Sequence, residues 1–80
     1  MKDLKQIGMN IRLLRTEKEM TQERLAAEAG VERSYMGGIE RGQRKFSVVI
    51  LIKVARALGC KPAKLLEGID ENEESIWGKI

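Results

Sequence analysis

The segment from Thr21 to Gly42 reads TQERLAAEAGVERSYMGGIERG and contains two short helical patterns separated by a turn. Thr21 can cap the first helix with its hydroxyl, and Gly30 can end that helix in a left-handed conformation. The small side chain of Ala26 allows a second helix to approach closely, while Val31 anchors the turn. This arrangement predicts a helix-turn-helix motif at about 21–42.

The sequence on both sides of this motif is also helical in pattern. Leu4, Ile7, Ile11 and Leu14 recur at the three- and four-residue spacing of one helix face. Glycines and cap residues divide the chain into five predicted helices, at about 2–19, 22–29, 33–41, 48–58 and 62–67. Because no segment alternates like a strand, we expect an all-α, compact five-helix domain.

The composition favours one small folded domain and argues against an enzyme. The chain has 80 residues, of which 42% are hydrophobic and 34% are charged. It has no histidine and one cysteine, Cys60, which we interpret as a small, partly buried apolar residue. We therefore expect no catalytic site, no metal and no cofactor.

The hydrophobic runs give no sign of a membrane protein. The longest apolar run, residues 48–52, is far shorter than the roughly 20 residues of a membrane span. The N-terminal residues are amphipathic and do not resemble a signal peptide. We expect a cytoplasmic location and no membrane partner.

The charge is distributed unevenly. The net charge of the chain is +3, but residues 1–68 carry fourteen Lys and Arg against eight Asp and Glu, whereas residues 69–80 carry four acids and one lysine. Four cations and one anion lie between Arg33 and Lys45. The pattern predicts a basic domain at 1–69 and an acidic tail at 70–80. Taken without its context, a basic cluster of this kind is usually a solvated face.

Together these residues resemble the lambda-repressor-like, xenobiotic-response-element (XRE) family of DNA-binding domains. The similarity covers residues about 5–69 and includes the segment PAKLLEG at 62–68. It implies five helices, with the third entering the major groove of double-stranded DNA. Within this family, RSYMGGIERGQR at 33–44 is similar to the controller proteins of restriction–modification systems, which are small dimers.

The resemblance also implies roles for individual side chains. Arg33 and Ser34 occupy the turn that faces base edges, and an arginine there can contact guanine through two hydrogen bonds. The candidate phosphate ligands lie on the second and third helices and on the loop that follows: Gln22, Tyr35, Arg41, Arg44 and Lys45. The resemblance further pairs Arg15 with Glu40 in a largely buried structural ion pair.

The two adjacent glycines of the third helix depart from many phage repressors. Those repressors carry a longer polar side chain at the position of Gly38 and use it to read a base. Since glycine has no side chain, we expect base reading to depend on Arg33 and on the shape of the DNA. Gly37 and Gly38 also leave a bare helix face that can lie deep in the groove.

The fourth predicted helix is apolar on more than one face. Residues 51, 54, 55 and 58 fit the core, and the remaining apolar residues predict a second buried surface. We assign it to a homodimer interface that includes Ile50, Ile52 and Leu66. The alternative is that the tail covers this surface through Ile76, Trp77 and Ile80.

Our main hypothesis is a sequence-specific transcriptional regulator that binds a near-palindromic operator as a homodimer. From the length of 80 residues we expect no separate domain that senses a small-molecule effector. A second hypothesis is the DNA-binding antitoxin of a toxin–antitoxin pair, whose acidic tail would bind the toxin. A third is a protein-interaction module that keeps the helical scaffold without binding DNA.

Overall fold

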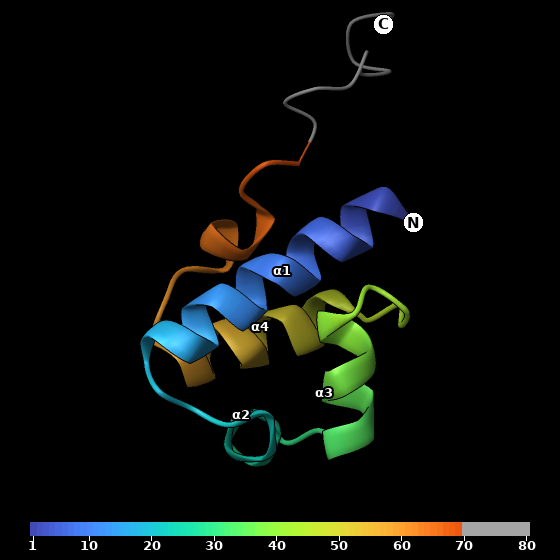
Figure 1. Ribbon diagram of the computed structural model, residues 1–80. Helices are drawn as coiled ribbons and strands as arrows, with labels where there is room; N and C mark the ends of the chain where they lie inside the picture. The colour runs from blue at the N-terminus through green and yellow to red at the C-terminus, as the bar shows by residue number, and fades with distance from the viewer. Residues whose placement is uncertain (70–80) are drawn as a thin grey trace, which may run out of the picture.

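The computed structural model describes residues 1–69, which form four α-helices and one short 3-10 helix and contain no strand. Figure 1 shows α1 and α4 crossing the upper part of the domain, with α2 and α3 together below them. The acidic tail predicted at 70–80 lies outside the described residues. The elements are α1 (Lys2–Glu17), α2 (Gln22–Ala29), α3 (Arg33–Glu40), α4 (Val48–Leu58) and η1 (Pro62–Leu66).

Side-chain caps fix where α2 and α4 begin. The Thr21 hydroxyl accepts a hydrogen bond from the backbone N–H of Arg24, and the Ser47 hydroxyl accepts one from that of Ile50. Each bond satisfies an N–H group that has no partner inside the helix. Both starting points are those that the sequence predicts.

The ends of the helices share one hydrogen-bonding pattern. After α2, Gly30 takes a left-handed conformation with φ of 73°, and the N–H of Val31 donates to the carbonyl of Ala26. After α3, Gly42 has φ of 72°, and the N–H of Gln43 donates to the carbonyl of Gly38. These bonds, which span five residues, are typical of Schellman motifs and turn the chain sharply.

Three predicted boundaries require correction. The first helix ends at Glu17 instead of Glu19, because Glu19 has a left-handed φ of 55° that is more usual for glycine. The third helix ends at Glu40 instead of Arg41. The fifth predicted element is a 3-10 helix over Pro62–Leu66 and not an α-helix over 62–67. The N–H of Lys64 donates to the carbonyl of Lys61, three residues earlier, which is the hydrogen-bond spacing of a 3-10 helix.

The core joins two pairs of helices. α1 packs against α3 and α2 packs against α4, while η1 closes the core against α1 and α4. The fourth helix buries the face that the sequence predicts, through residues 51, 54, 55 and 58. The side chains at the centre are fully buried: Leu25, Met36, Leu58 and Leu65.

α1 and α3 approach each other closely at Gly8. A β-carbon at Gly8 would collide with the backbone carbonyl oxygens of Ile39 and Glu40. The absence of a side chain therefore sets the separation of the two helices, and with it the position of α3 in the domain.

Candidate nucleic-acid interface

A buried polar network fixes the end of α3. The carboxylate of Glu40 accepts hydrogen bonds from Arg15 Nε at 2.7 Å and Arg15 Nη2 at 3.0 Å, and from Gln22 Nε2 at 2.8 Å. The side chains of Arg15 and Glu40 are only 12% and 2% exposed. Residues from α1, α2 and α3 thus meet at one carboxylate, and the ion pair implied by the resemblance is present in the structure.

Four of the predicted DNA-binding residues line one surface pocket between α2 and α3. This pocket contains Gln22 at the start of α2, both Arg33 and Ser34 at the start of α3, and Arg41 just after α3. Gly37, in the middle of α3, also lines the pocket. Residues that are separate in the sequence therefore share one accessible site.

The side chains around this pocket make only weak internal interactions. Arg33 lies 4.0 Å from Glu23, and both side chains are more than two thirds exposed. The Ser34 hydroxyl donates to Glu32, and Arg41 Nε donates to Gln43, in exposed hydrogen bonds. Because exposed pairs of this kind contribute little stability, these groups can exchange their partners for DNA at small cost.

Tyr35 is placed differently from the other candidate phosphate ligands. Its ring packs against the core, and its hydroxyl donates to the backbone carbonyl of Lys45 at 2.7 Å. A phenol has a single hydrogen to donate. In this geometry Tyr35 holds the loop between α3 and α4, and a bond from its hydroxyl to a phosphate would require that loop contact to break.

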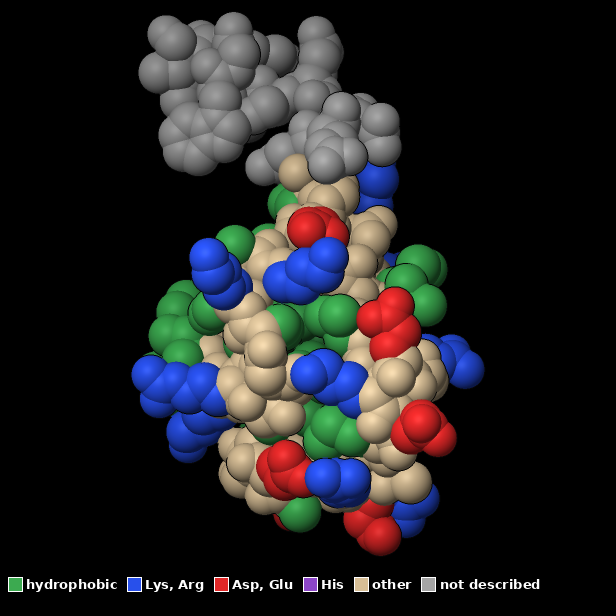
Figure 2. Space-filling view, turned by 90° about the vertical axis from the view of Figure 1, so that its left-hand side faces the viewer, with side chains coloured by type: hydrophobic (Ala, Val, Ile, Leu, Met, Phe, Trp, Pro, Cys, Tyr) green, Lys and Arg blue, Asp and Glu red, His purple; other side chains and the backbone are tan. Residues whose placement is uncertain are grey.

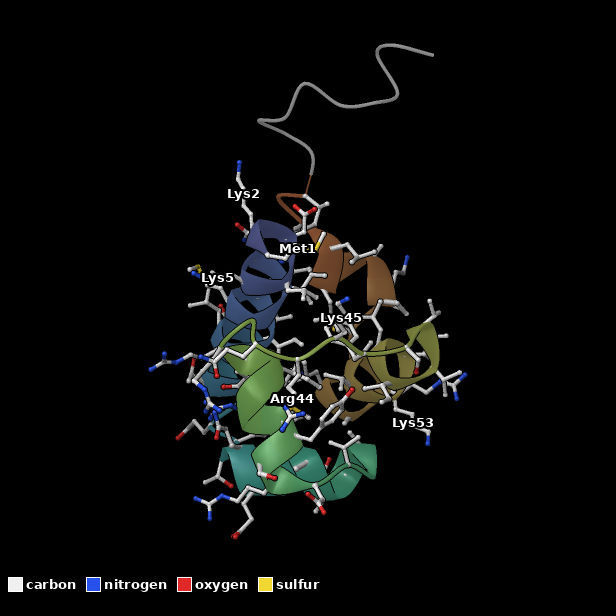
Figure 3. The ribbon with its side chains drawn as sticks, turned by 90° about the vertical axis from the view of Figure 1, so that its right-hand side faces the viewer. Met1, Lys2, Lys5, Arg44, Lys45 and Lys53 are labelled. Atoms are coloured by element: carbon white, nitrogen blue, oxygen red, sulfur yellow. The ribbon has the colours of Figure 1, made fainter. Side chains whose placement is uncertain are left out.

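The loop after α3 belongs to a broader basic face. Figure 3 shows this side of the domain, with labelled cations from α1, from the α3–α4 loop and from α4: Lys2, Lys5, Arg44, Lys45 and Lys53. In contrast, the side in Figure 2 carries acidic and basic side chains interspersed with hydrophobic ones. Arg44 and Lys45, two of the predicted phosphate ligands, are exposed.

Lys5 is a candidate that sequence reasoning missed. A β-carbon at Gly42 would lie 2.7 Å from the Cα of Lys5, so the start of α1 lies against the turn after α3. The helical pattern of residues 2–19 shows that Lys5 is off the core face. The pattern does not show that this helix begins beside the α3–α4 loop, because that contact depends on the tertiary structure.

The residues assigned to a dimer interface have unequal exposure. Ile50 and Ile52 are partly buried, and Ile50 packs against the core of its own domain. Leu66 is 41% exposed, and two valines at the start of α4, Val48 and Val49, are 70% and 60% exposed. An apolar surface therefore remains on α4 and η1, although its most exposed residues are not all those predicted.

Other chemical features of residues 1–69 are few. Cys60 is partly buried, and burial raises the pKa of its thiol, opposed by smaller effects of Lys18 and Lys64. Within the described part of the chain, no cluster of three or more potential metal ligands occurs. No helix there is long and apolar enough to cross a membrane.

Comparisons with known proteins agree with this geometry. The helix-turn-helix family matches residues 11–65. The restriction-modification controller protein C.AhdI from Aeromonas hydrophila has a TM-score of 0.80 and 48% identity, over 81% of this chain and 98% of its own. Control protein C.BamHI from Bacillus amyloliquefaciens is 41% identical over 61 residues, 75% of each chain.

A further relative extends the likeness over more of the sequence. The HTH-type transcriptional regulator y4dJ of Sinorhizobium fredii is 39% identical over 67 residues, covering 84% of this chain and 87% of its own. The family match at residues 11–65 includes α2, α3 and the turn between them. This chain belongs to the XRE-type helix-turn-helix family.

Proposed function

We propose that this protein is a DNA-binding transcriptional regulator that acts as the controller of a restriction–modification system. The observation that carries the proposal is the pocket between α2 and α3, where Gln22, Arg33, Ser34 and Arg41 converge beside a basic loop. The family and the controller proteins among the relatives support the same function.

The roles of the side chains follow from their positions. Arg33 and Ser34 begin α3 and are exposed, so they are assigned to base edges in the major groove. Gln22 and Arg41 line the same pocket. Together with Arg44 and Lys45 of the exposed loop after α3, they are assigned to phosphates. Gln22 has one constraint, because its amide nitrogen donates to Glu40 and leaves mainly the amide oxygen facing the pocket.

A homodimer accounts for the apolar surface on α4 and η1. Val49 and Leu66 are exposed hydrophobic residues on these two elements. A symmetric interface would bury both residues in each of the two protomers. A symmetric dimer would present two copies of α3 to DNA, about 34 Å apart if they bind successive turns. The operator would then be near-palindromic.

The test is a binding titration with the DNA upstream of the protein's own gene. We expect preference over a shuffled sequence of the same length at moderate salt, measured by fluorescence anisotropy. If a dimer neutralises about six phosphates, log K should fall against log salt with a slope near −5. Equal affinity for both sequences at every salt concentration would refute sequence-specific regulation.

A further inference from the structure

A surface hollow lies at the start of α1. Two methionines, two lysines and one glutamine line it: Met1, Met9, Lys2, Lys5 and Gln6. Met1 and Met9 are 75% and 55% exposed, so their apolar surface stays largely uncovered within residues 1–69. The volume of about 350 Å³ can admit a large side chain. Figure 3 labels Met1, Lys2 and Lys5 at this end of the domain. The hollow thus combines apolar surface with positive charge.

The described chain ends beside this hollow. Asn10 of α1 donates two hydrogen bonds from Nδ2, to the carbonyls of Leu65 at 3.0 Å and Glu67 at 2.8 Å, and so holds the end of η1 on α1. A β-carbon at Gly68 would lie 3.2 Å from Cδ of Gln6, a residue that lines the hollow. Figure 1 shows this last part of the described chain above α1. The acidic tail therefore starts next to the hollow.

The sequence of the acidic tail complements the hollow. It reads DENEESIWGKI at 70–80, outside the described residues, and four of its side chains are acidic. Its tryptophan, Trp77, has a ring that makes favourable contacts with methionine sulfur and with a lysine ammonium group. A chain spans at most about 3.6 Å per residue, so residues 70–77 are long enough to reach every part of the hollow.

The charges favour this hollow over the other one on α1. Leu13, which is 56% exposed, lines a second hollow that also contains the carboxylates of Glu17 and Glu67. The one lysine there, Lys64, already lies 3.3 Å from Glu67 in an ion pair. Because like charges repel, an acidic segment is disfavoured beside Leu13 and favoured at the start of α1. The apolar surface of α4 and η1 is assigned to the dimer.

We propose that the acidic tail binds in cis to the hollow at the start of α1, with Trp77 against the two methionines, and competes there with DNA. The competition follows from the position of Lys5, whose Cα would lie 2.7 Å from a β-carbon at Gly42, in the turn after α3. The bound tail brings carboxylates beside the loop whose Arg44 and Lys45 are assigned to phosphates. The competition rests on the proposed function, whereas the docking of the tail does not.

The fluorescence of Trp77 tests the docking without DNA. Trp77 is the single tryptophan of the chain, so emission excited at tryptophan wavelengths reports on the tail alone. At low salt, we expect the full chain to emit at a shorter wavelength than a free peptide of residues 70–80, and to be quenched less by acrylamide. Met9→Glu removes apolar surface and adds a negative charge to the hollow, so both values should move to those of the peptide.

Leu13→Glu is the matched control. Leu13 lies on the same helix, and its exposure of 56% is nearly that of Met9, at 55%. We expect this variant to leave the emission and the quenching of Trp77 unchanged, and circular dichroism checks that both variants fold. An effect of Leu13→Glu as large as that of Met9→Glu would overturn the proposed site. Emission of the unmodified chain equal to that of the peptide, or shielding lost on dilution, would overturn docking in cis.

A DNA titration tests the competition. Trp77→Ala removes the apolar contact of the tail but keeps every charge, so a change in affinity cannot come from net charge. If docking leaves about a tenth to a third of the molecules open to DNA, the variant should bind DNA about 3- to 10-fold more tightly. Added DNA should also shift the emission of Trp77 in the unmodified chain toward that of the peptide.

The outcomes separate this proposal from the proposed function. Equal DNA affinity of Trp77→Ala and the unmodified chain would refute the competition, even where fluorescence shows the docking. If the unmodified protein binds no DNA, the proposed function fails, and the fluorescence of Trp77 still decides whether the tail occupies the hollow.

Discussion

Arg15 and Glu40 join α1 to the end of α3 through two parallel hydrogen bonds, of 2.7 Å and 3.0 Å. Arg15 also donates to the backbone carbonyl of Met20 at 2.8 Å, and Glu40 accepts from Gln22. The pair therefore ties α3 to the first helix, to the α1–α2 turn and to α2. Any change in this pair should move the surface assigned to DNA.

Replacing Glu40 with alanine should destabilise the domain strongly. The change leaves the guanidinium of Arg15 partly buried without its counter-charge, which typically costs about 3–5 kcal/mol. The free energy of unfolding, measured by urea titration, should fall by that amount. In a small domain this is a large share of the total stability.

The Arg24–Glu28 pair on α2 supplies the matched control. It is also an arginine–glutamate pair, with a distance of 2.8 Å, but its side chains are 64% and 42% exposed. Glu28→Ala should change the unfolding free energy by at most about 0.5 kcal/mol. Equal costs for the two variants would contradict a buried network at Glu40.

Gly8→Ala should also destabilise the protein, although alanine is the better helix former. The new methyl group would press on the backbone carbonyls of Ile39 and Glu40, and backbone atoms cannot rotate away as a flexible side chain can. We expect a net loss of about 1–3 kcal/mol, measured by thermal or urea unfolding.

Gly37→Ala is the control for this change, because it makes the same substitution inside α3. Its methyl group would meet only the ends of the Arg41 and Gln22 side chains. The gain in helix propensity should then dominate, and stability should rise by up to about 1 kcal/mol. A loss at Gly37 as large as that at Gly8 would contradict the close helix crossing.

Tyr35→Phe should loosen the loop between α3 and α4 while it keeps the packing of the ring. The variant loses the hydrogen bond to the carbonyl of Lys45, which contributes no more than about 1 kcal/mol at an exposed site. Hydrogen–deuterium exchange should increase in residues 43–47, and DNA affinity should fall. The slope of log K against log salt should not change, since the phenol carries no charge. Unaltered exchange in this loop would refute the positioning role.

The sequence predicts well those features that depend on local chemistry. Thr21 and Ser47 cap their helices through short-range hydrogen bonds, and Gly30 ends α2, so their patterns can be read from neighbouring residues. The end of α1 is harder, because Glu19 takes the left-handed conformation without the glycine that usually marks it. The 3-10 geometry of η1 is likewise not distinguishable from a short α-helix by pattern alone.

The relations that define the site are mostly tertiary. Spacing alone cannot show that the start of α1 lies against Gly42, which brings Lys5 to the loop, or that Tyr35 bonds Lys45. Gly38 illustrates the limit most clearly: its sequence context indicates a missing side chain, and the structure fills that space with Arg44. Such contacts depend on how the turns between helices bring distant segments of the chain together in the folded domain.

Leu66→Asp should convert the proposed dimer into a monomer without unfolding it. Leu66 is 41% exposed in the described domain, so the change removes little from the core, but two buried carboxylates would oppose association. Sedimentation velocity should show the unmodified chain as a dimer and the variant as a monomer, with similar circular dichroism spectra. Ala27→Asp, at an exposed position of α2, is the charge control and should remain dimeric. A variant at Leu66 that still sediments as a dimer would place the interface away from η1.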